Sequence, residues 1–318
     1  MKKFTIWAVI LAGLAYGGAK AYLHSEVADS MDMAVLMMSP YATVEYAGVR
    51  STMTGELTIE GIRVKLHDFR DDFVIDRLGI DTPSFLSLVK MNDYMSMRGD
   101  SLPDSFGLLI EGLHLQTDAD FFKEVYEFGA TARGSVGEPT ASAMCTGKYG
   151  FAPDTLQALG YSEQVFSMAM TVHNRGRDFE LEVQSGIENM WEVDANLTLA
   201  GDLLNEMLKG ASYRPRLSKL TIDYTDRSLN SRIRKLCKSL GLSEEETLKA
   251  QMDAFKYQGE SNGIVFDEYL LEPYLEFLKG KERIKFTAKP NEPIAMSQID
   301  LYKASDVPAL LNLEAQVF

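Results

Sequence analysis

The residues that most directly suggest chemistry form the tetrapeptide Gly99-Asp100-Ser101-Leu102. A serine hydroxyl becomes a nucleophile when a histidine base, oriented by a carboxylate, removes its proton. The sequence around the tetrapeptide supplies no such base. We therefore interpret Ser101 as part of a polar loop and predict no catalytic residue.

The same tetrapeptide resembles the nucleophile block of the hydrolase family that is named after it. The resemblance implies an Asp-x-x-His motif near the C-terminus, in which the aspartate orients the histidine. None of the histidines follows an aspartate by three positions; they are His24, His67, His114 and His173. An extracytoplasmic serine hydrolase that uses Ser101 therefore stays the third alternative for the function.

A possible metal ligand pair, Glu111 and His114, has the Glu-x-x-His spacing of metal-binding helices. The flanking alternation of apolar residues predicts a strand, in which positions i and i+3 point to opposite faces. The acidic run Glu244–Glu246 is typical of the first turn of a helix. The sequence thus predicts no metal site and no cofactor.

Two cysteines, Cys145 and Cys237, allow one intramolecular disulfide. Such a bond persists in an oxidising compartment. The alternative is two separate buried thiols, because Cys237 lies on the apolar face of a predicted helix. Two cysteines 92 positions apart do not form a zinc site.

The N-terminal segment predicts contact with a membrane. Lys2 and Lys3 precede Phe4 to Ala19, 16 residues without a charge. These residues span about 24 Å as a helix, and continuing to Leu23 gives about 30 Å, the thickness of the hydrocarbon core, if Lys20 snorkels. The anchor residues that we assign are Phe4, Trp7, Ile10, Leu11, Leu14 and Tyr16.

A retained anchor is favoured over a cleaved signal peptide, because the small-x-small site Ala19-Lys20-Ala21 contains a base. Cleavage near Ala21, with release into the periplasm, stays the alternative. By the positive-inside rule, Lys2 and Lys3 lie in the cytoplasm. We therefore expect a single-pass protein of the bacterial inner membrane with residues from about 24 onward in the periplasm.

The charge of the chain excludes one class of partner. The formal net charge is −14, although the first 20 residues contain three lysines and no acid. The rest of the chain is therefore more acidic still and should be repelled by phosphates. We predict no nucleic-acid partner.

The apolar periodicity predicts the elements of an α+β fold. From Thr43 to Pro83 apolar residues alternate with polar ones, and the phase changes after Gly61, as a bulge or bend requires. The alternation returns from Leu108 to Leu115, with a second change of phase at Gly112. Farther along, a hairpin is expected over 166–183, followed by strands at 191–199 and 220–224. Three helices and a last strand at 284–288 complete the pattern; Ser243 and Glu246 form a capping box.

The predicted domain organisation has three parts. Residues 1–23 form the signal anchor or signal peptide, 24–140 a β-rich N-terminal part, and 141–318 an α+β C-terminal part. The boundary follows the small, polar stretch 129–142, which is typical of a linker. The last two parts are alternatively one continuous domain. We expect a predominantly antiparallel, curved β-sheet body with C-terminal helices.

After the anchor, the segments Val44–Val49 and Thr54–Val64 resemble the opening of AsmA-type proteins of Gram-negative envelopes. The resemblance covers about the first 85 residues. It implies a periplasmic role in envelope biogenesis, with lipid acyl chains handled on a curved, apolar sheet. The expected function is thus that of a membrane-anchored, non-enzymatic protein that binds lipid or another hydrophobic ligand. A structural subunit of an envelope complex, with envelope proteins as partners and no ligand, is the alternative.

Overall fold

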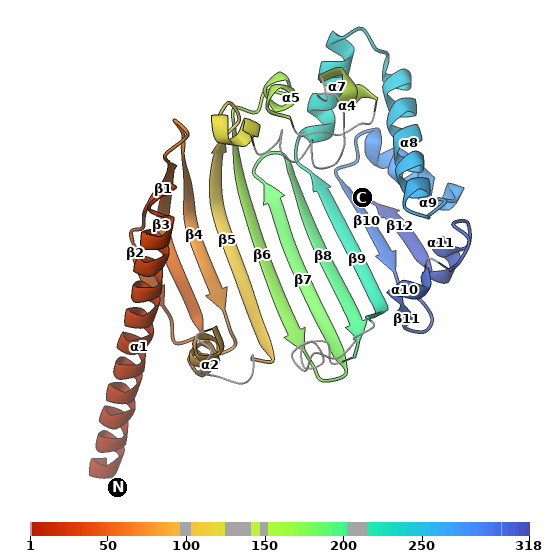
Figure 1. Ribbon diagram of the computed structural model, residues 1–318. Helices are drawn as coiled ribbons and strands as arrows, with labels where there is room; N and C mark the ends of the chain where they lie inside the picture. Colours follow the sequence, from red (N-terminus) through yellow and green to blue (C-terminus); the bar gives the residue numbers. More distant parts are fainter. Residues whose placement is uncertain (1, 96–102, 125–140, 147–151, 202–214, 300) are drawn as a thin grey trace. The chain divides into compact units, whose positions relative to one another are not determined.

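The computed structural model describes residues 2–95, 103–124, 141–146, 152–201, 215–299 and 301–318, without the side chains of 2–16, 19, 95, 141 and 142. These residues form an α+β fold with a large antiparallel sheet of 12 strands (Figure 1), which confirms the predicted class. The chain divides into unit 1, Met1–Gly112, and unit 2, Leu113–Phe318. The division lies within strand β5, whereas the predicted boundary near residue 140 lies outside the described residues.

Unit 1 is a small antiparallel sheet with two helices, ordered β1-β3-β4-β5 with β2 beside β1 on β3. Its elements are α1 (Lys2–Met38), β1 (Ala42–Glu45), β2 (Gly48–Ser51), β3 (Glu56–Leu66), β4 (Asp72–Asp81), α2 (Phe85–Met95) and the first part of β5 (Ser105–Gln116).

The strands of unit 1 change phase where the sequence predicts it. Gly61 in β3 has φ 61° and Gly112 in β5 has φ 64°, both in the left-handed region that glycine adopts without strain. A Cβ at Gly112 would collide with the Asp76 carboxylate of β4. Ile59 before the shift and Ile62 after it pack in one cluster. The glycines therefore keep the apolar residues of both halves together.

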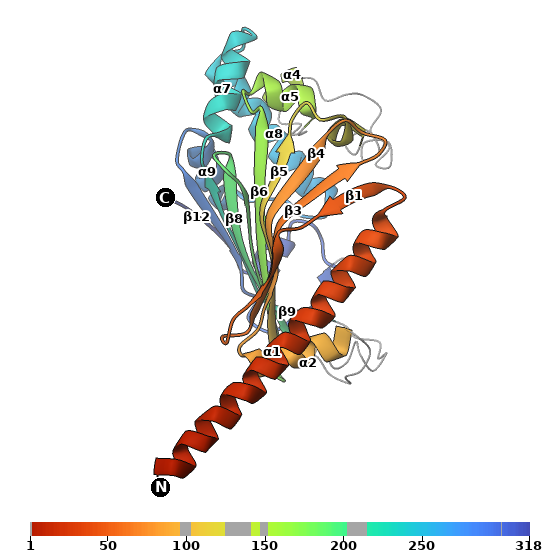
Figure 2. The ribbon, with the colours of Figure 1, turned by 90° about the vertical axis from the view of Figure 1, so that its left-hand side faces the viewer.

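Helix α1 continues well beyond the predicted anchor and packs on the sheet of unit 1 (Figure 2). Leu23 is buried against Leu57 of β3. His24 Nε2 lies 2.8 Å from the Ser51 hydroxyl, and farther along α1 the Tyr46 hydroxyl donates to Asp32 at 3.0 Å. Sequence reasoning ended this helix near residue 23 because polar residues begin there; packing on the sheet extends it to Met38.

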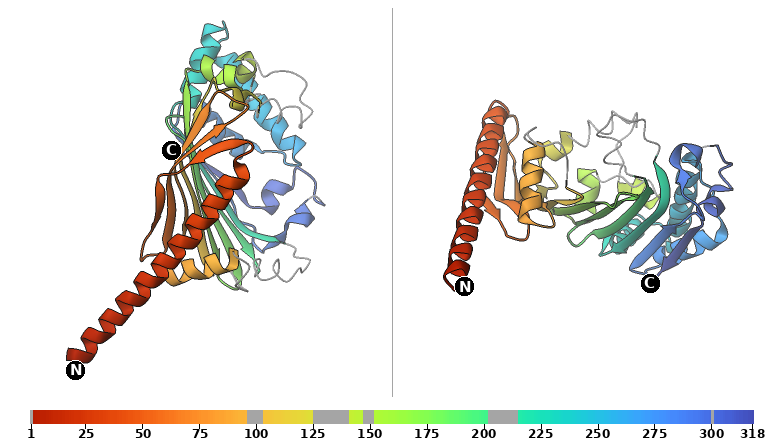
Figure 3. Two further views of the ribbon diagram at one scale, coloured as in Figure 1. Left: turned by 60° about the vertical axis from the view of Figure 1, so that its left-hand side comes forward. Right: turned by 90° about the horizontal axis from the view of Figure 1, so that it is seen from below.

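Unit 2 contains a meander of long strands, ordered β6-β7-β8-β9-β10-β12 with β11 on β9. The sheet of this unit curves (Figure 3). Its elements are α4 (Ala141–Cys145), α5 (Pro153–Ala158), β6 (Glu163–Asn174), β7 (Asp178–Ile187), β8 (Trp191–Ala200), β9 (Arg216–Asp226), α7 (Leu229–Ser239), α8 (Glu244–Ser261), α9 (Glu268–Leu278), β10 (Arg283–Ala288), β11 (Ile294–Ala295), α10 (Met296–Ile299), α11 (Val307–Leu310) and β12 (Leu313–Val317).

The predicted hairpin, capping box and helices of unit 2 are confirmed. β6 and β7 pair in continuous register from Phe166↔Ile187 to Asn174↔Phe179. Ser243 Oγ accepts from the Glu246 amide, and the Glu246 carboxylate accepts from the Ser243 amide at 2.8 Å. Sequence reasoning missed β12, which pairs with β10 and places the chain end on the sheet.

Candidate functional site

The register of unit 2 sorts apolar and polar side chains onto opposite faces of its sheet. Across five strands, Met170, Val183, Ala195, Ile222 and Phe286 are successive cross-strand partners and so share one face. We call these five residues the central apolar row. The alternation that produces it was visible in the sequence of each strand, but its register was not.

The opposite face of the same strands is polar and charged. One residue along β9 from the central row, Asp223 pairs with Asp194 of β8 and Lys285 of β10. Arg283 donates to both oxygens of Asp223, at 2.7 and 2.5 Å. These bonds hold the pKa of Asp223 below its usual value against the effect of burial. Because this face carries charged side chains such as the Asp223–Arg283 pair, the apolar face is the one suited to a hydrophobic ligand.

None of the five residues of the central apolar row is fully buried. Ile222 is 38% exposed although it lies in the middle of β9, between the apolar partners Ala195 and Phe286. A residue in the middle of a sheet strand is usually covered when its face is apolar. The row is therefore an open apolar surface in the part of unit 2 that the structure describes.

Helices cover this face at one end and along one side. At the end of β8, Trp191 packs against the cluster that contains α5 and α7. Along the β10 side, Phe286 and Ile284 pack against Phe277 of α9. Phe286 is thus the covered end of the row, and the other four residues of the row lie between the two covered regions. Among the described residues, the helices thus border the apolar face and leave its middle partly exposed.

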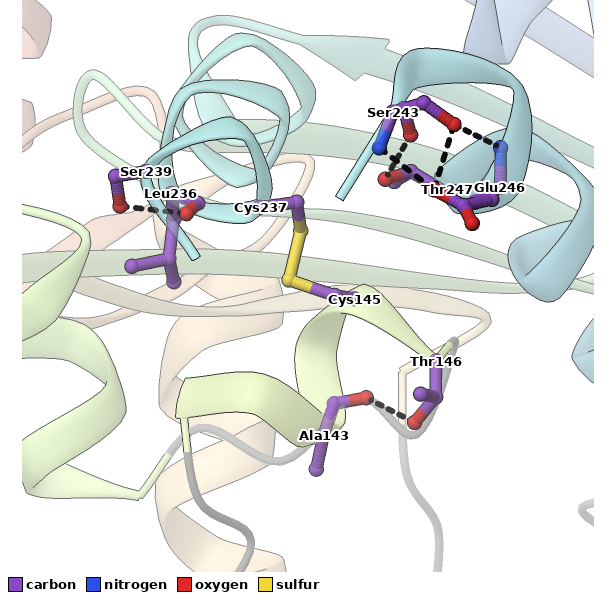
Figure 4. The surroundings of a disulfide bond; sticks show 9 residues. All are labelled: Ala143, Cys145, Thr146, Leu236, Cys237, Ser239, Ser243, Glu246 and Thr247. Atoms are coloured by element: carbon purple, nitrogen blue, oxygen red, sulfur yellow. Dashed lines mark hydrogen bonds between the residues drawn. A yellow bond between two sulfur atoms is a disulfide. The ribbon is translucent and has the colours of Figure 1, made fainter. Parts of the chain in front are cut away.

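The disulfide belongs to the covering helices. Cys145 of α4 and Cys237 of α7 are bonded, with S–S 2.00 Å and Cα–Cα 5.6 Å (Figure 4). Each cysteine is 1% exposed and lies in the same cluster as Ile233 and Leu156. The bond therefore ties the short helix α4 to α7 at the covered end of the face.

Polar groups lie beside the covered end of the apolar face. Trp191 is the cross-strand partner of Asp226, whose Oδ1 accepts from the Asn230 amide at 3.0 Å. Burial raises the pKa of the Asp226 carboxyl, and burial likewise raises the pKa of Tyr224. Trp191 Nε1 and Asn230 Nδ2 are buried and have no hydrogen-bond partner among the described residues. An acceptor group of a ligand would satisfy such donors.

The residues considered for catalysis and metal binding are not assembled into a site. The Glu111 carboxylate accepts a hydrogen bond from Arg77 Nε at 2.7 Å, and His114 Nδ1 lies 3.1 Å from Glu163 Oε1. Both Glu111 and His114 lie in strand β5, as predicted. No group of three or more metal-ligating side chains occurs among the described residues. Ser101 lies outside those residues.

The predicted anchor lies in the N-terminal half of α1. The side chains of its six residues, from Phe4 to Tyr16, are outside the described part of the chain. Within the described residues, no helix has the length and apolar character needed to span a bilayer. The anchor therefore stays a prediction.

Comparison with known proteins adds no functional assignment. The chain matches no protein-family model, and no curated protein is significantly similar to it in sequence.

Proposed function

We propose that this chain is a non-enzymatic protein of the bacterial inner membrane that holds an apolar ligand, such as a lipid acyl chain, on unit 2 in the periplasm. Its role is envelope biogenesis. The N-terminal half of α1 is the anchor. The observation that carries the proposal is the central apolar row, which from Met170 to Ile222 is left partly exposed by the helices that the structure describes.

The composition of the row and its surroundings fits an acyl chain. Each methylene group that leaves water contributes about 0.8 kcal/mol of binding free energy. Met168 and Met170 of β6 are half-buried on this face, and flexible thioethers adapt to apolar chains of differing shape. A curved, apolar surface of this kind therefore favours a lipid over a compact polar metabolite.

The proposed compartment fits two other features. The Cys145–Cys237 bond is of a kind that persists where thiols are oxidised, as in the periplasm. The strongly negative net charge is compatible with a body that does not bind nucleic acid. Neither feature depends on the ligand.

A binding titration tests the proposal. The chain has two tryptophans, Trp7 and Trp191; in full-length Trp7→Phe protein, Trp191 alone reports on the face of unit 2. Trp191 and Ala195 are four residues apart on one face of β8, about 13 Å. Titration with a fatty acid that carries a nitroxide on its chain should quench Trp191 saturably.

The matched variants are Ile222→Asp and Thr221→Asp. Thr221 is the neighbouring residue of β9 and lies on the polar face, opposite Asn196 and Thr287. Ile222→Asp should weaken binding at least tenfold, because a carboxylate on the row must stay hydrated, whereas Thr221→Asp should not. Circular dichroism checks that both variants fold. Equal quenching of the two, or no saturable quenching, contradicts the proposal and favours a structural subunit without ligand.

A further inference from the structure

Helix α1 leaves the sheet of unit 1 at a defined level. Gly17 and Gly18 are exposed, and a Cβ on either would meet no atom within 4 Å. Leu23, less than two turns later, is buried against Leu57 and Leu88. The part of α1 before about residue 20 therefore extends beyond the body of unit 1, as Figures 1 and 2 show.

The loop between β2 and β3 and the start of α2 lie at this same end of unit 1. His24 contacts Ser51, the last residue of β2, so the turn that follows Ser51 lies beside α1. Both the amide and the hydroxyl of Thr82 donate to the Gly55 carbonyl, at 3.0 and 2.9 Å. This contact joins the turn to the segment that begins α2. Figure 2 shows α2 beside the emerging part of α1.

Three large apolar side chains are exposed at this end. Met53 in the turn is 68% exposed, Leu86 in α2 is 67% exposed, and Tyr22 in α1 is 46% exposed. We call these three residues the apolar rim. In α2, Leu88 and Met91 are buried and already supply the contact with the sheet. Leu86 is therefore not needed to hold α2 on the sheet.

The position of the rim along α1 matches the boundary of a bilayer. A helix needs about 20 residues to cross the roughly 30 Å hydrocarbon core, and 20 residues counted from Phe4 end at Leu23, one residue after Tyr22. The headgroup region on each side of the hydrocarbon core is roughly 5–8 Å thick. Tyrosine is enriched at this depth, where its ring contacts acyl chains and its hydroxyl contacts water. If Phe4–Leu23 spans the core, the rim lies at the boundary between the acyl chains and the headgroups.

We propose that the apolar rim of unit 1 inserts into the membrane interface around the emerging helix. This inference rests on the membrane anchoring in the proposed function, and it adds a second contact with lipid. The side chains of Met53 and Leu86 contact the part of the acyl chains that lies next to the headgroups. Lys90, exposed on α2, meets lipid phosphates. Unit 1 is thereby held against the bilayer by its surface as well as by its anchor.

Site-directed fluorescence in the full-length protein tests the rim. Met53→Cys and Leu86→Cys are each labelled with an environment-sensitive dye and reconstituted into phosphatidylethanolamine–phosphatidylglycerol vesicles. The native cysteines are bonded and buried, so they do not react. Asp68→Cys is the control, because Asp68 is exposed at the other end of β3, about 30 Å from the rim.

The expected result is a blue shift of dye emission at positions 53 and 86, with quenching by lipids that carry a nitroxide near the headgroup, and neither effect at position 68. If the protein floats with the vesicles but all three dyes stay in water, the rim is overturned and the anchor stands. If the protein does not float with the vesicles, both the anchor and the rim are overturned. Floating with quenching at position 68 equal to that at 53 and 86 also overturns the rim.

Discussion

Removing the Cys145–Cys237 bond should destabilise unit 2 by an amount that follows from chain length. The bond joins residues 92 positions apart. On the chain-entropy model, closing a loop of that length restricts the unfolded chain by about 4.6 kcal/mol at 25 °C. In a double Cys145→Ala, Cys237→Ala variant, the free energy of unfolding should be lower by that amount, and slightly lower still because the packing contacts of two buried sulfur atoms are lost. For a unit of this size, the melting temperature should fall by roughly 10–18 °C.

Urea unfolding monitored by circular dichroism measures this difference. The oxidised protein is compared with the double variant, and each is repeated with a thiol reductant. Reductant should move the unfolding midpoint of the oxidised protein toward that of the variant and leave the variant unchanged. A difference below about 1 kcal/mol, with the bond verified by mass, would refute the loop-entropy reasoning. A reductant effect on the variant would show that the effect does not come from this bond.

The other predictions concern single contacts. Arg283→Ala should lower the stability of unit 2 by about 2 kcal/mol at pH 7, because it leaves the Asp223 carboxylate with its charge-assisted bonds broken. Folding lowers the pKa of Asp223, so the stabilisation by this ion pair is present above the unfolded pKa and is lost as pH falls through the folded pKa. The difference in urea midpoint between the unchanged protein and Arg283→Ala should therefore shrink in that acid range. A difference that does not change with pH would contradict the assignment. Gly112→Ala should destabilise unit 1 by at least 1 kcal/mol in thermal unfolding, because φ is 64° there, whereas no change would show that β5 tolerates a side chain. Ser243→Ala should lower the stability of α8 by about 1 kcal/mol through loss of the capping box, measured by hydrogen exchange, and an unchanged exchange rate would refute it.

The sequence predicted those elements whose signals are local. The alternation of apolar residues predicts the phase shifts at Gly61 and Gly112, and the structure places both glycines in the left-handed region. The capping box at Ser243 needs only four residues to be recognised. In each case, the residues that decide the conformation are neighbours in the chain.

Features that depend on distant partners were not predictable in the same way. Packing of Leu23 on Leu57 extends α1 past its apolar segment. The residues near Leu23 do not indicate that a sheet packs against this part of the helix. The central apolar row needs the register of five strands, and Ile222 alone reads as an ordinary strand residue. Whether helices covered that row could not be decided from the helical sequences, since their apolar faces fit either arrangement.

The unbroken course of α1 has a geometric consequence for a chain anchored as proposed. One helix of 37 residues contains both the anchor and the residues that pack on unit 1. No break in the helix separates these two groups of residues. The direction in which unit 1 faces around the helix axis is therefore fixed by the number of residues between them. One residue inserted near Lys20 would swing unit 1 by about 100° about the helix axis and raise it by about 1.5 Å, whereas seven would nearly restore its original heading.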